Sequence, residues 1–454
     1  MNSTIGSTST GKPQRVDELR RLVGVGFGVA VVLGGMIGIG ILRTPAMVAG
    51  WVSNPPLILM LWVVAGAYIL INALCLAELA TAFPRAGGPY VFARRAFGDF
   101  AGFAVGWVDW TLNAAGLAFL AVAFADYAVL IVPKLGGHQG VAAAAVIAAL
   151  ATVNWFSLSL GAVVQQALSA LKATAFLALI VGCFVLGHSP STAAANEPLM
   201  RGSSVPLMLG IVLSLQPIME AYGGWNSAVY FAEEDRNPER NIVRSLVGGV
   251  LLVMAIYVLT NAALLYVLTV PEIASTQIPA ALAAERSFGA HSGLFITGIA
   301  LLSLLAITNT LMMFTPRILF GLSRDGLFSA RGARLNRYGT PGNALILTAA
   351  TAVTLTLSGT FESLYLAVAF LHLCINVAMV AALFGVRRNH AGTARPYAVP
   401  WYPWLPLIAL GGSLAILGAF LYGNTLNSLI SIAAAVLSYP VYRFTRRART
   451  AREP

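Results

Sequence analysis

The chain has 454 residues, of which 58% are hydrophobic and 10% are charged. An average soluble protein has about 25% charged residues, so this composition excludes an ordinary water-soluble fold. The formal net charge is +11, and its meaning depends on where the basic residues lie along the chain.

Apolar segments recur along the chain with a length of about 20 residues or more, which is what a helix needs to cross a bilayer. They predict an all-α polytopic membrane protein with twelve transmembrane helices. The predicted spans are 23–50, 56–83, 100–132, 140–157, 161–188, 205–232, 243–270, 292–322, 342–358, 361–386, 403–423 and 426–444. The polar start, 1–21, leads into a span too long for a signal peptide, so we expect this helix to be retained.

The first predicted span contains four glycines within an apolar helix pattern: Gly34, Gly35, Gly38 and Gly40. Each one weakens a helix by up to about 1 kcal/mol relative to alanine. We therefore expect a break in this helix. Close helix packing is the alternative, because small residues serve that purpose in membranes.

The fifth predicted span carries Lys172, and an ionisable residue inside a membrane is costly enough to be a functional candidate. We expect it to cycle a proton, or to act as a fixed cation that holds helices one, five and eight. Asn309 in the eighth span is a candidate polar contact for this coupling site. The carboxylates Glu78, Asp109 and Asp126 also fall in predicted spans, and structural pairing is the favoured interpretation for Asp109 and Asp126.

The sixth predicted span contains Pro217 and the sequence YGGW, Tyr222 to Trp225, which together interrupt a helical hydrogen-bond pattern. Interruptions at corresponding places in two halves of a chain indicate an inverted-repeat transporter with its site at the membrane midplane. Freed N–H groups can bind a carboxylate and freed carbonyls can accept hydrogens from an ammonium. A zwitterion, which carries both a carboxylate and an ammonium, fits these two kinds of freed backbone group.

Glu220 directly precedes this second break. Its carboxylate can select a cationic side chain or a second amine, or carry a proton. The alternative is a glutamate that is hydrogen-bonded within the bundle, or one that a one-residue difference in register places outside the site.

Charged residues follow the sixth span, and we expect an inner gate formed by Glu233, Glu234 and Arg240. Arg85 is a candidate partner, together with Arg94 and Arg95. A solvated loop is the alternative interpretation of this segment.

The basic residues fall on one side of the predicted topology, since only Lys134, Arg201 and Arg286 lie on the other side. We expect a protein of the inner membrane, and the positive-inside rule then places both termini in the cytoplasm. The net charge is explained by topology and contact with lipid headgroups, so nucleic acid is not an expected partner. Neither a phosphate-binding loop nor a catalytic or metal-ligating cluster is evident, which predicts a protein that is not an enzyme and uses no cofactor.

Five motifs occur in order: GGMIGIGIL in the first span, ELATAFPRAGGPYVFARRAFGDFAGFAVGW, AYGGWNSAVYFAEEDRNPERNIVRS, PRILFGLSRDGLF and TPGNA. Together they resemble the amino acid-polyamine-organocation superfamily. AYGGWN and VQQALSALK are most similar to the L-type amino acid transporter branch and its bacterial relatives.

The resemblance implies a LeuT-like fold, in which helices 1–5 and 6–10 form a 5+5 inverted repeat, helices 1 and 6 are broken and two C-terminal helices are appended. It also implies alternating access without a prosthetic group. The expected parts are a cytoplasmic tail at 1–22, the two repeats at 23–190 and 205–388, helices 11 and 12 at 400–445, and a cytoplasmic tail at 446–454.

The resemblance also assigns residues by position. The backbone of Ile37, Gly38, Ile39 and Gly40 would bind the substrate carboxylate, and Met36, Ala221, Tyr222 and Gly223 would face its amino group or side chain. Ile39 departs from the small hydroxyl residue common in the family, which removes one donor and narrows the pocket. Lys172 matches the place where sodium-coupled relatives hold sodium, and Glu220 replaces an aromatic gate.

These observations predict a secondary active transporter of amino acids, neutral ones favoured, that works by proton symport or by exchange against a counter-substrate. Transport of cationic amino acids or polyamines through Glu220 is an alternative. A transporter-like amine sensor without useful flux is another, although it would need an output domain.

Overall fold

The fold is described from a computed structural model that covers residues 19–156, 158–188, 206–289, 292–358, 361–423, 425–436 and 438–443. Within these ranges the elements are helices, apart from an isolated bridge between Val23 and Asp235. The α-helices are α1 (Val25–Met36), α2 (Gly40–Trp51), α3 (Pro55–Ala82), α4 (Pro89–Phe97), α5 (Asp99–Val129), α6 (Gln139–Phe156), α7 (Leu158–Leu186), α9 (Leu207–Ala221), α10 (Pro238–Val267), α11 (Val270–Ser275), α12 (Pro279–Phe288), α13 (Gly293–Arg324), α14 (Gly342–Ser358), α15 (Phe361–Asn389), α16 (Trp404–Gly423) and α17 (Thr425–Val436). The 3-10 helices are η1 (Pro133–Leu135), η2 (Ser227–Glu234) and η3 (Ala330–Ala333).

In the described ranges, 8 helices are long and apolar enough to cross a membrane: α3, α5, α6, α7, α10, α13, α15 and α16. The pair α1 and α2 adds one more span that is bent by 45° at its break. The chain is therefore a multi-pass membrane protein. Helices α9 and α14 are apolar but shorter than a full span, and the total of twelve spans stays a prediction.

The sixth predicted span, 205–232, is not one continuous helix. Helix α9 ends at Ala221, a run of turns follows, and the chain continues as the 3-10 helix η2. Pro217 lies inside α9 and does not end it. The break comes later because Gly224 has a φ of +86°, which a right-handed helix cannot contain.

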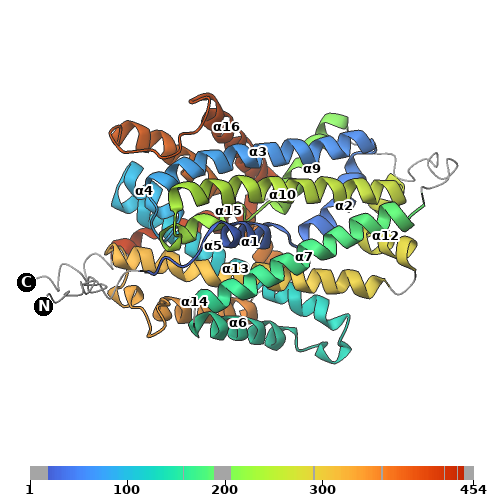
Figure 1. Ribbon diagram of the computed structural model, residues 1–454, viewed down its shortest axis with the longest axis horizontal. Coiled ribbons are helices and arrows are strands. Elements are labelled where there is room, and N and C mark those ends of the chain that lie inside the picture. The colour runs from blue at the N-terminus through green and yellow to red at the C-terminus, as the bar shows by residue number, and fades with distance from the viewer. Residues whose placement is uncertain are drawn as a thin grey trace, which may run out of the picture.

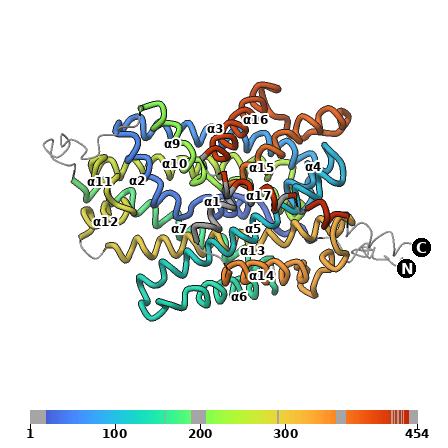
Figure 2. The backbone as a smooth tube through the Cα atoms, turned by 180° about the vertical axis from the view of Figure 1, so that it is seen from behind, coloured from blue at the N-terminus to red at the C-terminus, as the bar shows by residue number. Residues whose placement is uncertain are grey.

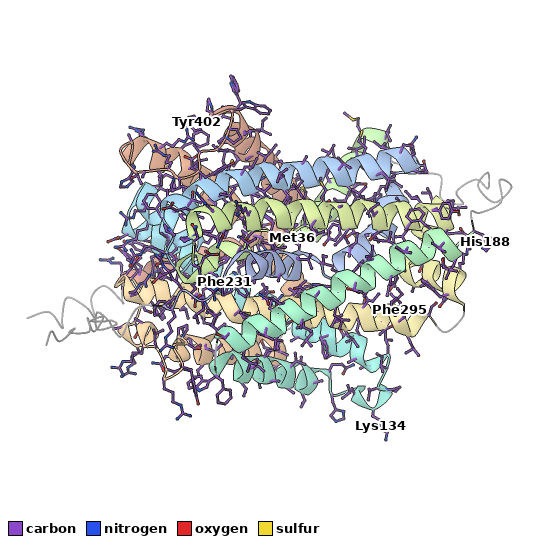
Figure 3. The ribbon with its side chains drawn as sticks, viewed as in Figure 1. Met36, Lys134, His188, Phe231, Phe295 and Tyr402 are labelled. Carbon is purple, nitrogen blue, oxygen red and sulfur yellow. The ribbon has the colours of Figure 1, made fainter. Side chains whose placement is uncertain are left out.

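Helix α1 lies in the interior of the bundle, where it packs against α7, α10 and α13 (Figure 1). It is apolar on all sides and most of its residues are buried, as expected for a helix surrounded by others. Seen from behind, α6 and α14 lie together at one edge and α16 lies near the opposite edge (Figure 2). The labelled Met36, at the end of α1, lies near the middle of the bundle (Figure 3).

Candidate functional site

The first break leaves residues 37–39 between α1 and α2 without regular helical structure. The carbonyl of Ile39 accepts the amides of Leu42 and Arg43 at 3.0 and 3.1 Å, which starts α2. In the described part of the chain, no backbone carbonyl accepts an amide from residues 38–41. Free amides at a helix N-terminus attract anions. The segment predicted to bind a carboxylate thus presents suitable donors.

The second break lies directly against the first. A Cβ placed on Gly224 would be 2.5 Å from the carbonyl oxygen of Gly35, and one placed on Gly40 would be 3.0 Å from the Cα of Ala221. Such distances leave no room for a side chain at either glycine. The backbones of the two breaks are therefore in contact, and the glycines permit this.

Tyr222 and Gly223 stand at the start of the second break. The side chain of Tyr222 is fully buried, and its hydroxyl donates to the carbonyl of Trp62 in α3 at 3.1 Å. The amide of Gly223 donates to the carbonyl of Glu220 at 2.9 Å. The backbone of this segment lies at the break, whereas the ring of Tyr222 packs against the rings of Trp62 and Tyr257.

Tyr257 of α10 connects the two breaks. Its hydroxyl lies 2.7 Å from the carbonyl oxygen of Met36 and 2.8 Å from that of Ala221, the last residues of α1 and α9. A single hydroxyl hydrogen is shared between these two acceptors. Our sequence analysis missed this residue, because nothing in the sequence distinguishes it from an ordinary buried aromatic residue.

Lys172 of α7 is fully buried, and its ammonium donates to the carbonyls of Gly34 and Ile37 at 3.1 and 2.6 Å. Gly34 lies in the last turn of α1 and Ile37 is the first residue after it. No carboxylate pairs with Lys172 among the described residues. Among the described residues, the hydrogen-bond acceptors for this buried ammonium are thus backbone carbonyls in the last turn of α1 and at the start of the first break.

Asn309 of α13 does not contact Lys172 directly. Its amide donates to the side chain of Gln165 at 2.9 Å, and its oxygen accepts from Asn154 at 3.0 Å. Gln165 donates to Ser169 at 3.1 Å, and Ser169 donates to the carbonyl of residue 30 in α1 at 2.7 Å. Asn309 is therefore connected to α1 through a chain of hydrogen-bonded polar side chains. This chain ends at the carbonyl of residue 30, one turn before Gly34, whose carbonyl accepts from Lys172.

Glu220 lies in the last turn of α9 and is partly buried. Its neighbour for side-chain hydrogen bonding is Gln216, one turn earlier on the same helix. No arginine or lysine pairs with it in the described part of the chain. The carboxylate thus lies two residues before Tyr222, where the break starts, and has no cationic partner among the described residues.

The gate residues find different partners from those expected. Glu233 is paired with Arg324 at 2.5 and 2.7 Å, and Glu234 is paired with Arg317 at 2.6 and 2.9 Å. Arg240 is exposed. The physical reason is that α13, with 32 residues, extends far enough to place its last two turns beside η2.

The predicted arginine partners pair elsewhere. Arg85 and Arg94 both bind Asp325, just after α13, at 3.2 and 2.6 Å. Arg95 lies over the ring of Phe83. Arg85, Arg94 and Arg95 thus form no ion pair with the two glutamates, although Arg85 is close enough to Glu233 to interact with its charge and Glu233 accepts the backbone amide of residue 86 at 2.8 Å. The inner gate itself stays a prediction.

The remaining intramembrane carboxylates fall into three cases. Glu78 is buried and paired with Arg387 at 2.6 Å. Asp109 is buried too, but it accepts hydrogen bonds from the neutral groups of Tyr230 and Asn113 at 2.9 Å each. Asp126 is exposed. Of the two carboxylates for which the sequence favours pairing, Asp109 is satisfied by neutral donors and Asp126 is exposed, whereas Glu78 pairs with a cation.

Comparison with known proteins gives the chain its family. The family model described as amino acid permease matches residues 29–439. The serine/threonine exchanger SteT of Bacillus subtilis (strain 168) is 28% identical over 431 residues, which cover 93% of this chain and 96% of that protein. The human b(0,+)-type amino acid transporter 1 is 25% identical, with coverage of 95% and 85%, and the human cystine/glutamate transporter is 26% identical, with coverage of 97% and 89%. With a match over most of its length, the chain belongs to the amino acid permease family.

Proposed function

We propose that this permease moves amino acids across the membrane by alternating access, with neutral amino acids as its preferred substrates and exchange as its mode. The observation that carries the proposal is the contact between two broken helices. Free amides at residues 38–41 can donate to an anion, and the two breaks meet at Gly40 and Ala221. An α-amino acid has its carboxylate and ammonium two bonds apart, which suits donors and acceptors on adjoining breaks.

The name of one relative supports the choice of substrate and mode. It is a serine/threonine exchanger. Serine and threonine are neutral, and exchange needs no ion gradient. Proton symport is the other mode consistent with a buried lysine, since Lys172 lies at the first break.

Sodium coupling is disfavoured by the same contacts. A sodium ion at this place would need oxygen ligands, and the carbonyls of Gly34 and Ile37 are already bound by Lys172. A second cation there would meet the ammonium charge directly. The lysine thus takes the place of an ion.

We place the arginine-rich end of the bundle, which includes Arg317 and Arg324, in the cytoplasm, with both termini on that side of the inner membrane. The repeats 23–190 and 205–388 then each contribute one broken helix to the site. Two further helices at 400–445 complete the proposed twelve.

A second candidate substrate class is cationic amino acids or polyamines, and Glu220 favours it. A carboxylate without a cationic partner next to the break can bind the distal ammonium of such a substrate. The two candidates differ only in what Glu220 does.

The experiment is uptake of radiolabelled amino acids and polyamines by the purified protein in liposomes. Three conditions are compared: an imposed proton gradient, a sodium gradient, and preloaded unlabelled amino acid. Uptake that requires preloaded substrate supports exchange, and uptake that follows the proton gradient replaces it with symport. Binding of a ligand without any uptake would contradict transport and favour a sensor.

A further inference from the structure

An open groove of about 370 Å³ lies on the outside of the bundle, away from the two breaks. It is lined by Phe384, Arg387, Arg388, Ala391, Arg395 and Tyr402. These residues come from the last turns of α15 and from the segment that leads to α16. Tyr402 is labelled at the outer edge of the molecule in Figure 3.

The groove has an excess of positive charge. The carboxylate of Glu78 accepts hydrogen bonds from Arg387 at 2.8 and 2.6 Å and lies 3.5 Å from the Nε of Arg395. Arg388 is exposed, and it forms no ion pair with any described residue. One carboxylate thus pairs with two guanidinium groups, and the third arginine that lines the groove, Arg388, is available to a ligand from outside.

Part of this cluster serves the protein itself. Arg387 and Glu78 join α15 to α3, and Glu78 also accepts the amide of Val399 at 2.7 Å. Arginines in the last turn of a helix are also favoured by its dipole. The dipole of α15 favours Arg387 and Arg388 alike, but the carboxylate of Glu78 is satisfied without Arg388, so the guanidinium of Arg388 is open to a ligand.

The surroundings of the groove indicate a membrane surface. Trp401 and Trp404 flank Tyr402 and are 78% and 69% exposed. Tryptophan and tyrosine gather at the level of lipid headgroups, and arginine there binds phosphate. The ring of Tyr402 lies 3.8 Å beneath the guanidinium of Arg387, which holds both side chains in place.

We propose that this groove binds the phosphate of an anionic glycerophospholipid, with Arg388 as the main free hydrogen-bond donor. Trp401 and Trp404 would then pack against the parts of the acyl chains nearest the headgroup. The site is independent of the substrate site and of the orientation of the chain. It requires only that α15 ends at a membrane surface.

The test uses the full-length protein in a neutral detergent and native mass spectrometry to measure the affinity for the first bound phosphatidylglycerol. Arg388→Gln is compared with Arg334→Gln, which removes the same charge from an exposed site between η3 and α14. We expect Arg388→Gln to weaken phosphatidylglycerol binding about fivefold, since one arginine near an anionic surface contributes about 1 kcal/mol. We expect Arg334→Gln to leave the affinity for phosphatidylglycerol unchanged. We also expect Arg388→Gln to leave the affinity for phosphatidylcholine unchanged.

Equal losses in the two variants would mean a general surface charge effect and would overturn the site. Unchanged binding in Arg388→Gln would overturn it as well. Inorganic phosphate is added as a competitor, and displacement of the lipid at equal concentration would assign the groove to a free anion in place of a lipid. Because Arg388 has no ion pair among the described residues, this variant is expected to fold normally.

Discussion

The ammonium of Lys172 donates to the carbonyl of Ile37 at 2.6 Å, so a charge on α7 binds the first residue after α1. The same ammonium reaches the carbonyl of Gly34 at 3.1 Å. Movement of α1 relative to α7 must therefore break or exchange two charged hydrogen bonds. A transporter that alternates between states needs such a contact to be reversible.

We predict that Lys172→Ala lowers amino acid uptake about tenfold or more. Hydrogen bonds to charged groups contribute about 1.5–3 kcal/mol each, and the variant loses two of them at the first break. Uptake into liposomes measured between pH 5 and 8 gives both the rate and its dependence on pH. Lys134→Ala is the matched control, because Lys134 is exposed in η1.

The role of Lys172 would be wrong if the variant kept both the rate and the pH profile of the original protein. A lower rate with an unchanged pH profile would assign it to a fixed cation. A lower rate together with a flattened profile would assign it to proton coupling.

Tyr257→Phe is expected to reduce uptake about five- to tenfold while the protein still folds. The ring remains, but the carbonyls of Met36 and Ala221 lose a shared donor that is worth about 1 kcal/mol. Initial rates over a range of substrate concentrations check this. Tyr266→Phe on the same helix is the control, since Tyr266 is 38% exposed, and an equal effect there would contradict a specific role for the hydroxyl of Tyr257.

Gly224→Ala should destabilise the protein and abolish most of its uptake. The left-handed conformation costs an alanine about 1–2 kcal/mol, and the Cβ of this alanine would lie 2.5 Å from the carbonyl oxygen of Gly35. Thermal unfolding in detergent measures the loss. Gly248→Ala in α10 is the control, because a Cβ there meets no atom within 4 Å and alanine favours a helix. Equal melting temperatures for the two variants would show that the breaks do not touch.

Sequence periodicity was sufficient for much of this fold. Glycines in an apolar run weaken a helix wherever they occur, so the break between Met36 and Gly40 follows from local properties of the chain. The helical membrane character follows equally from segment length. The position of the second break was harder to predict. Pro217 lies inside α9 without ending it, and the break comes at the following turns, which contain Gly224 with its positive φ.

Contacts between distant segments could not be predicted in the same way. That Arg317, and not Arg85, meets Glu234 depends on how far α13 extends past η2. That Tyr257 meets both breaks depends on the crossing of α10 with α1. Neither quantity is encoded in a local pattern, and both arise from packing of the whole bundle.

Glu220→Gln tests which substrates the protein carries. If Glu220 binds a distal ammonium, the variant should lose uptake of lysine and arginine about tenfold relative to serine, because a charged hydrogen bond contributes about 1.5–3 kcal/mol. If neutral amino acids are the substrates, the ratio stays the same. Competition uptake with both classes in one assay gives this ratio, and Glu285→Gln in α12 is an exposed control.

The pair of Glu234 and Arg317 allows a further test, this time of stability. Both side chains are buried, and two hydrogen bonds of 2.6 and 2.9 Å connect them. Removing one partner leaves a buried charge, which costs about 3–5 kcal/mol. We therefore predict a large fall in melting temperature for Glu234→Gln and for Arg317→Gln.

Glu234→Gln combined with Arg317→Gln should recover a substantial part of this loss, because no unpaired charge remains in the double variant. Glu272→Gln is the control, since Glu272 pairs with Arg286 near the surface, where such a pair contributes about 0–1 kcal/mol. Strictly additive losses in the double variant would show that the two groups are not coupled.

The same variants test whether the pair also closes the cytoplasmic side. If it does, the double variant should exchange substrate more slowly than the original protein, because the neutral pair holds η2 against α13 less firmly. This slower exchange is expected even though the double variant is more stable than either single variant. Uptake rates of the three variants, normalised to the amount of folded protein, separate this role from stability alone.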